Sequence, residues 1–299
     1  MGPQGVAVAA RLVLYIAVLG LFGTAALALY APAAFALAYP RRAMIGAAGA
    51  ALAATALGLG VLAAQITGGT LAALDAGSLL SVATGTGAGL ATLVRFAALA
   101  GGLVVLTPPP SASPVRAVVL LVLAGVAVAT LAWGGHAAAS EGALGLVRLA
   151  ADVLHLLAAG VWLGALAVFL RLMRSDARED ADQVQACLAQ FSGIGSGVVA
   201  VLLLTGVVNL VLALGWAHLP SIAASLWGWL LLIKLVLFIA MLGLAAFNRF
   251  RLTPALGVAS MRLAAQAALR RSLVLETATA LLIIALVAWL GTLSPLPGG

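Results

Sequence analysis

Residues 225–247, SLWGWLLLIKLVLFIAMLGLAAF, decide the fold, because this long apolar run holds a single charge, Lys234. About 20 apolar residues cross the roughly 30 Å hydrocarbon core of a bilayer as an α-helix, whereas a membrane β-strand needs only about 9–11 residues. A helix also pairs its own backbone groups in lipid, where an unpaired group is costly. The run therefore predicts a membrane-spanning helix.

Runs of this kind recur along the chain, which predicts an all-α polytopic membrane protein with about eight transmembrane helices. The runs are 12–36, 43–65, 88–106, 115–133, 147–170, 191–214, 225–247 and 272–293. The Gly-, Thr- and Ser-rich segment 66–87 is expected to be either a plain loop or partly re-entrant. We expect one membrane domain over 1–299, with an N-terminal four-helix part (1–130) and a C-terminal four-helix part (131–299).

The composition excludes a soluble globular protein. Hydrophobic residues make up 65% of the chain and charged residues 8%, against about half and about a quarter in soluble domains. Cys187 is the single cysteine, so an intrachain disulfide and a thiolate metal cluster are excluded as well.

The arginines predict the orientation in the membrane. Cytoplasmic loops carry an excess of Lys and Arg, and the loops after the first, third, fifth and seventh runs hold most of them. Both termini are therefore expected outside, in the periplasm, and the net charge of +7 needs no nucleic-acid partner. The loop arginines are Arg41, Arg42, Arg116, Arg171, Arg174, Arg178, Arg249, Arg251, Arg262, Arg270 and Arg271.

The predicted topology places all three histidines in its outer, periplasmic half. They are His136, His155 and His218. Asp152 lies three residues before His155, so the two side chains share a helix face. The carboxylate could orient the imidazole, or both could bind one metal ion. The alternative is an interfacial Asp–His pair that only hydrogen-bonds to neighbouring helices.

Other polar residues lie within the predicted spans, where each should have a partner or line a wet cavity. Glu276 is expected to pair at the level of Asn248, and Gly160 and Gly164 are expected at a close helix contact. These residues either line a transport path or are structural. The set is Arg95, Trp162, Asn209, Lys234 and Glu276.

Several short strings in the second half of the chain resemble the copper-resistance D family (CopD/PcoD-type). They are His136-Ala137, Asp152-Val-Leu-His155 continuing to Trp162-Leu-Gly164, Thr205-Gly206-Val-Val-Asn209, Lys234, Asn248-Arg249-Phe250, and Arg270-Arg271-Ser-Leu-Val-Leu-Glu276. Their order and spacing hold over roughly 130–295, whereas residues 1–130 match only in their apolar spans.

The resemblance implies a bacterial inner-membrane protein of copper homeostasis that imports copper and is not an enzyme. It also implies a periplasmic copper-binding partner of CopC type. Imidazole and carboxylate suit Cu(II), whereas Cu(I) prefers Met and Cys, so Cu(II) is favoured while Cu(I) stays open. We expect the entry site at His136, Asp152 and His155, with His218 as a further candidate.

Two other functions use the same residues. Histidines on neighbouring helices could ligate haem b, which would make the protein a membrane redox protein. Alternatively, the chain could be a non-catalytic assembly scaffold whose histidines are dispensable.

Overall fold

The computed structural model describes residues 3–38, 40–108, 113–134, 142–173, 181–215 and 225–293. Every regular element in these ranges is helical. Within the described ranges, eight helices are long and apolar enough to cross a membrane. The predicted all-α fold with eight spans is therefore confirmed.

The elements follow one another with short connections. The helices are α1 Pro3–Tyr30, α2 Pro32–Ala38, α3 Arg41–Thr67, α4 Ala76–Gly85, α5 Gly87–Leu106, α6 Pro114–Ala129, α7 Gly142–Leu172, α8 Ala181–Leu214, α9 Leu226–Phe247, α10 Thr253–Leu256 and α11 Arg262–Leu290, with 3-10 turns η1 Leu71–Ala73 and η2 Thr130–Gly134 and a π-helical turn η6 Asn248–Leu252.

Two segments differ from the sequence prediction. The first predicted span, 12–36, is divided between α1 and α2 at Pro32, whose ring has no backbone N–H to donate inside a helix but is tolerated at a helix start. Segment 66–87 is not a plain loop, because it forms η1 and α4. Asp75 caps α4 by accepting a 2.7 Å hydrogen bond from the backbone N–H of Ser78, and this bond lowers the pKa of the Asp75 carboxyl.

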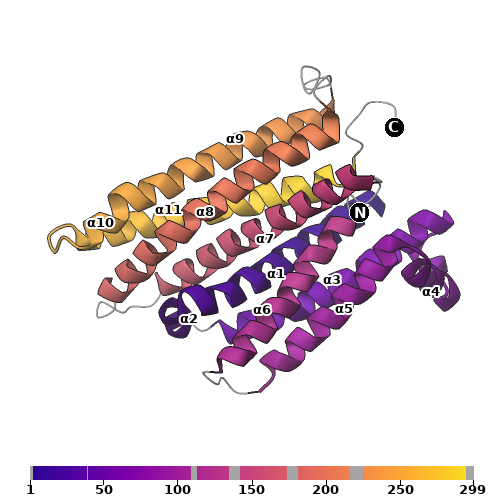
Figure 1. The fold of residues 1–299 in the computed structure, drawn as a ribbon, viewed down its shortest axis with the longest axis horizontal. Coiled ribbons are helices and arrows are strands. Elements are labelled where there is room, and N and C mark those ends of the chain that lie inside the picture. Colours follow the sequence, from indigo (N-terminus) through magenta and orange to yellow (C-terminus); the bar gives the residue numbers. More distant parts are fainter. Residues whose placement is uncertain are drawn as a thin grey trace.

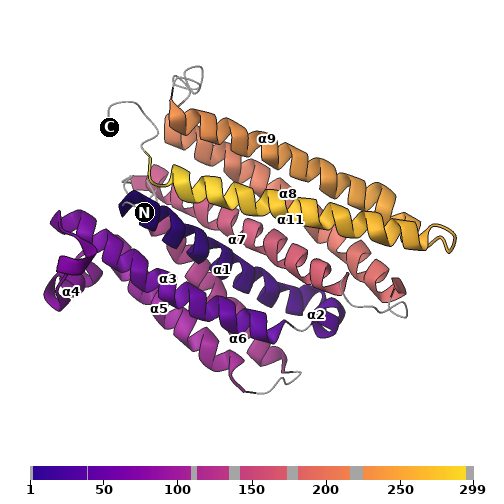
Figure 2. The same ribbon diagram turned by 180° about the vertical axis from the view of Figure 1, so that it is seen from behind.

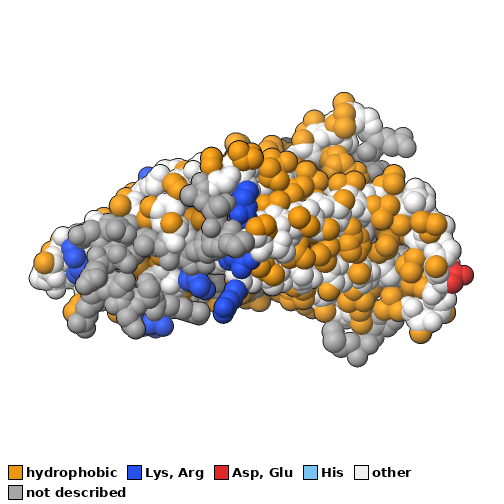
Figure 3. Space-filling view, turned by 90° about the horizontal axis from the view of Figure 1, so that it is seen from below, with side chains coloured by type: hydrophobic (Ala, Val, Ile, Leu, Met, Phe, Trp, Pro, Cys, Tyr) orange, Lys and Arg blue, Asp and Glu red, His pale blue; other side chains and the backbone are white. Residues whose placement is uncertain are grey.

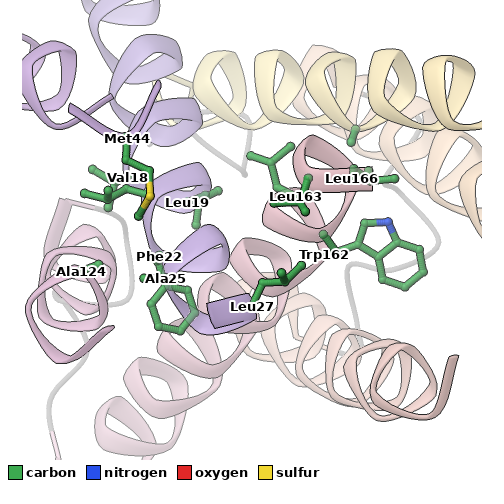
Figure 4. Packing of buried hydrophobic residues seen from close by; sticks show 14 of the residues in the cluster. Val18, Leu19, Phe22, Ala25, Leu27, Met44, Ala124, Trp162, Leu163 and Leu166 are labelled. Carbon is green, nitrogen blue, oxygen red and sulfur yellow. The ribbon is translucent and has the colours of Figure 1, made fainter. Parts of the chain in front are cut away.

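Helix α1 lies in the middle of the bundle and packs against α3, α6, α7 and α11. Figures 1 and 2 show α3, α5 and α6 on one side of the α1–α7 pair and α8, α9 and α11 on the other. A continuous buried cluster joins the helices around α1, and Figure 4 shows Leu19 and Phe22 of α1 among residues of neighbouring helices. The site described below lies on the α7–α8–α9 side of this core.

Three glycines bring α1 and α7 into backbone contact. A Cβ built on Gly23 would lie 1.8 Å from the Gly160 carbonyl oxygen, and one built on Gly164 would lie 2.1 Å from the Gly23 carbonyl carbon. Small residues allow membrane helices to approach this closely. The predicted close helix packing at Gly160 and Gly164 is confirmed.

The outer surface is largely apolar, as expected for helices in lipid. Large exposed hydrophobic side chains occur on most of the long helices, and Figure 3 shows them spread over one face, with Lys and Arg toward one end. Helix α1 begins and α11 ends at the same end of the bundle (Figure 1). We call this the terminal end, and its periplasmic placement stays a prediction.

Candidate functional site

His155 is a half-buried residue of α7 whose ring is fixed by α8. Its Nδ1 lies 2.9 Å from Thr205 Oγ1, and the Thr205 hydroxyl donates to the Val201 carbonyl oxygen at 2.6 Å. Because a hydroxyl has one hydrogen, Thr205 can only accept from His155 if both contacts are hydrogen bonds. Nδ1 then carries the ring proton, and Nε2 keeps a free lone pair that can bind a metal.

Asp152 lies one turn from His155, and two basic side chains lie close to it. Its carboxylate is attracted by Arg148 on its own helix and by Lys234 of α9, and Tyr15 of α1 lies nearby. Asp152 and Lys234 are both partly buried. The interaction brings Lys234 of α9 close to the α7 face that carries Asp152.

Asn209 provides an acceptor close to the same face of α8. It follows Thr205 by four residues, so the two share a helix face, and its Oδ1 is buried without a hydrogen-bond partner. An unsatisfied buried acceptor costs about 1–3 kcal/mol. This oxygen is thus a position where a bound ion, its water or another donor would restore a lost interaction.

The structure gathers only part of the predicted metal site. Asp152 and His155 lie together on α7, whereas His136 and His218 fall outside the described residues. Among the residues that the structure describes, no group of three or more His, Cys, Asp or Glu side chains could hold a metal ion. The described donors of the candidate site are therefore His155, Asp152 and Asn209.

Trp162 and Glu276 form a second polar site two turns further along α7. Trp162 Nε1 donates to Glu276 Oε1 at 3.1 Å, and Asn248 Nδ2 donates to Glu276 Oε2 at 2.9 Å. Glu276 is only 4% exposed, so these donors replace the water that its carboxylate gives up. The prediction that Glu276 pairs at the level of Asn248 is confirmed.

Arg95 of α5 makes its hydrogen bonds outside both polar sites. Its Nε donates to Thr130 Oγ1 at 2.9 Å, and its Nη2 donates to the Thr130 carbonyl oxygen at 2.8 Å. The side chain is 7% exposed. Arg95 therefore joins α5 to the end of α6, which is the structural role that the sequence left open.

One residue near the site was not predicted from the sequence: Tyr15 of α1 lies close to Asp152, Arg95 and Arg11. Its signal in the sequence is faint, since a tyrosine within an apolar helix is ordinary. The role of Thr205 had a clearer signal, because the i, i+4 spacing with Asn209 places two polar groups on one face of α8.

Comparison with known proteins adds a family resemblance to this geometry. Residues 3–146 match the family model described as copper resistance protein D-like, N-terminal domain, and residues 185–290 match the one described as copper resistance protein D. The segment of α7 that carries Asp152 and His155 lies between the two matched ranges. No solved structure matches the chain.

Two known proteins are similar to the chain. It is 40% identical over 218 residues to copper resistance protein D of Pseudomonas syringae pv. tomato, covering 71% of this chain and 70% of that protein. It is 33% identical over 124 residues to the inner membrane protein YebZ of Escherichia coli (strain K12), covering 42% of each. The likeness to the first relative spans more than two thirds of both chains.

Proposed function

We propose a copper-importing function for this chain, which belongs to the copper resistance protein D family. Its eight apolar helices and its relatives make it a multi-pass inner-membrane protein. In this function copper is the cargo, and the chain acts as a carrier and not as an enzyme. Copper binds near the terminal end of the bundle and then moves toward the opposite end.

The single observation that carries the proposal is the His155–Thr205 contact within the spans. It directs the free Nε2 of a neutral imidazole away from Thr205, and such a nitrogen is a strong ligand for copper. A histidine bound to a metal usually donates its other ring N–H to an oxygen, which fixes the ring and raises its basicity. Thr205 provides that oxygen here.

The neighbouring groups favour Cu(II) at this entry site. Asp152 offers a carboxylate and Asn209 an amide oxygen, and these ligand types suit Cu(II) better than Cu(I). His136 and His218 would add imidazoles from the predicted periplasmic loops. A periplasmic copper-binding protein of CopC type would deliver the ion at this end.

The inward path would follow the polar face of α7. Trp162 lies seven residues beyond His155, which is about two turns and roughly 10 Å along the helix axis. Lys234 of α9 borders the start of this path through its interaction with Asp152. A cation close to the path would disfavour tight retention of Cu(II), because like charges repel, and this would help the ion to leave.

The test is elemental analysis with an absorption spectrum on the detergent-purified protein, loaded with Cu(II) or Cu(I) and then desalted. We expect stoichiometric copper in the wild type and a loss of most of it in His155→Ala. The matched control is Glu276→Gln, which removes an ionisable group from the other polar site and should retain bound copper. Full copper in monodisperse His155→Ala protein would refute the site, and a Soret band would indicate haem b instead.

A further inference from the structure

A cavity of about 630 Å³ opens between α7, α8, α9 with η6, and α11. This size lies within the usual range of small-molecule sites, about 300–1,000 Å³. Its walls are mainly apolar, and four aromatic side chains contribute to them: Trp162, Phe169, Phe191 and Phe250. The cavity therefore suits a ligand with an apolar, flat body.

The cavity opens on the outer surface of the bundle. Three of its lining residues, Ser196 of α8, Ala246 of α9 and Phe250 of η6, are exposed. Further along the same two helices, large apolar side chains such as Leu204 and Ile239 are also exposed, at 69% and 68%. A ligand would consequently enter from the bilayer.

The polar wall of the cavity has unused acceptors. Each carboxylate oxygen of Glu276 accepts one hydrogen bond, from Trp162 or from Asn248, and so retains further lone pairs. Asn248 Oδ1 is buried without a hydrogen-bond partner. The ligand that best satisfies this wall carries hydrogen-bond donors.

The charged residues of the cavity wall bear on the net charge that a ligand can carry. The cavity wall carries one carboxylate, Glu276, and one guanidinium, Arg249. A ligand of either charge is attracted by one of these groups and repelled by the other, which favours a neutral ligand. Arg249 itself donates to the Ser192 carbonyl oxygen and to Ser196 Oγ. An acyl chain would fill the apolar space but would leave Asn248 Oδ1 without a partner.

We propose that this cavity binds a neutral, membrane-soluble aromatic alcohol with the chemistry of a quinol. The ring packs against Trp162 and the phenylalanines, and its hydroxyl groups donate to Glu276 and Asn248. The proposal concerns binding alone and does not depend on copper transport.

The experiment measures binding to the full chain in phosphatidylcholine nanodiscs that contain no quinone. Equilibrium dialysis compares a short-chain ubiquinol with its dimethyl ether, which has the same ring and tail but no hydroxyl donor. We expect the quinol to bind at least tenfold more tightly than the ether. Equal affinities would show only apolar partition, and absence of binding would remove the site; both results overturn the proposal.

Two variants test the assigned wall. Glu276→Gln replaces one acceptor by a donor and should abolish the preference for the quinol over the ether. Ala246→Trp narrows the opening without touching the acceptors and should weaken binding of both compounds. Thr279→Val is the control and should behave as wild type, because Thr279 is a half-buried residue of α11 outside the cavity lining whose hydroxyl donates to the Leu275 carbonyl oxygen. Unchanged binding in both well-folded cavity variants would contradict the assignment.

Discussion

The Thr205 hydroxyl decides which ring nitrogen of His155 is available to a metal, because its own hydrogen is donated to Val201. An imidazole without such a partner would rotate and exchange tautomers. Fixing a side chain in one rotamer costs conformational entropy. Because Thr205 already orders the His155 ring, less of this entropy is lost when the metal binds. The residue is thus a positioning group for the proposed copper site.

Thr205→Val should lower copper affinity by about 10–100-fold, the usual effect of removing an oxygen that orients a metal-binding histidine. The valine keeps the shape of the side chain but cannot accept the hydrogen bond that the His155 Nδ1–H donates. Thr277→Val is the matched control, because the Thr277 hydroxyl also donates to a carbonyl one turn back. Competition titration with a copper chelator gives both affinities, and equal values for the two variants would contradict the positioning role.

Asp152 and Lys234 should act on copper affinity with opposite signs. Asp152→Asn removes an anion near the ion and should weaken Cu(II) binding, whereas Lys234→Met removes a cation and should strengthen it. We expect changes of about tenfold, equivalent to about 1.4 kcal/mol. The double variant should lie near wild type, and changes of the same sign in both single variants would argue against binding beside these charges.

At the scale of elements, the α1–α7 crossing depends on the absence of side chains at Gly23, Gly160 and Gly164. Gly164→Ala should lower the melting temperature, because overpacking a tight contact costs about 1–3 kcal/mol. Gly20→Ala on α1 is the control, since a Cβ there meets no atom within 4 Å, and it should not destabilise the protein. Fluorescence-detected size-exclusion chromatography after heating gives the melting temperatures of the two variants. Equal melting temperatures would contradict the close α1–α7 packing.

The sequence predicts the spans well because apolar length alone decides whether a segment crosses a bilayer. It predicts the boundaries less well, because polar turns can extend a helix past its apolar part: α8 begins at Ala181 and α11 at Arg262, each ahead of the predicted start. The π-helical turn Asn248–Leu252 has no strong local signal in the sequence.

The candidate site was predictable only where its residues share one helix. The spacing of Asp152 and His155 is visible in the sequence, and so is that of Thr205 and Asn209. The pairing of α7 with α8 that joins these two faces is a tertiary contact, and no local pattern specifies it. The same limit applies to the Trp162–Glu276 hydrogen bond, whose residues lie far apart in the chain.

At the scale of the whole molecule, the arginine distribution predicts that the terminal end faces the periplasm. Alkaline phosphatase fused after Gly299 should be active in cells, because the enzyme matures only in the oxidising periplasm. The same enzyme inserted within 257–261, between α10 and α11 at the opposite end, should be inactive. The reverse pattern would invert the topology and place His155 in the cytoplasmic half.

The central place of α1 has a consequence for how the protein is made. Helix α1 leaves the ribosome well before two of its packing partners, α7 and α11. At 5–20 residues per second, the ribosome finishes α11 on the order of ten to fifty seconds after α1. Until α7 has been made, the α1 backbone at Gly23 lacks the contact that Gly160 and Gly164 provide, and the bundle closes around α1 only after α11 has followed.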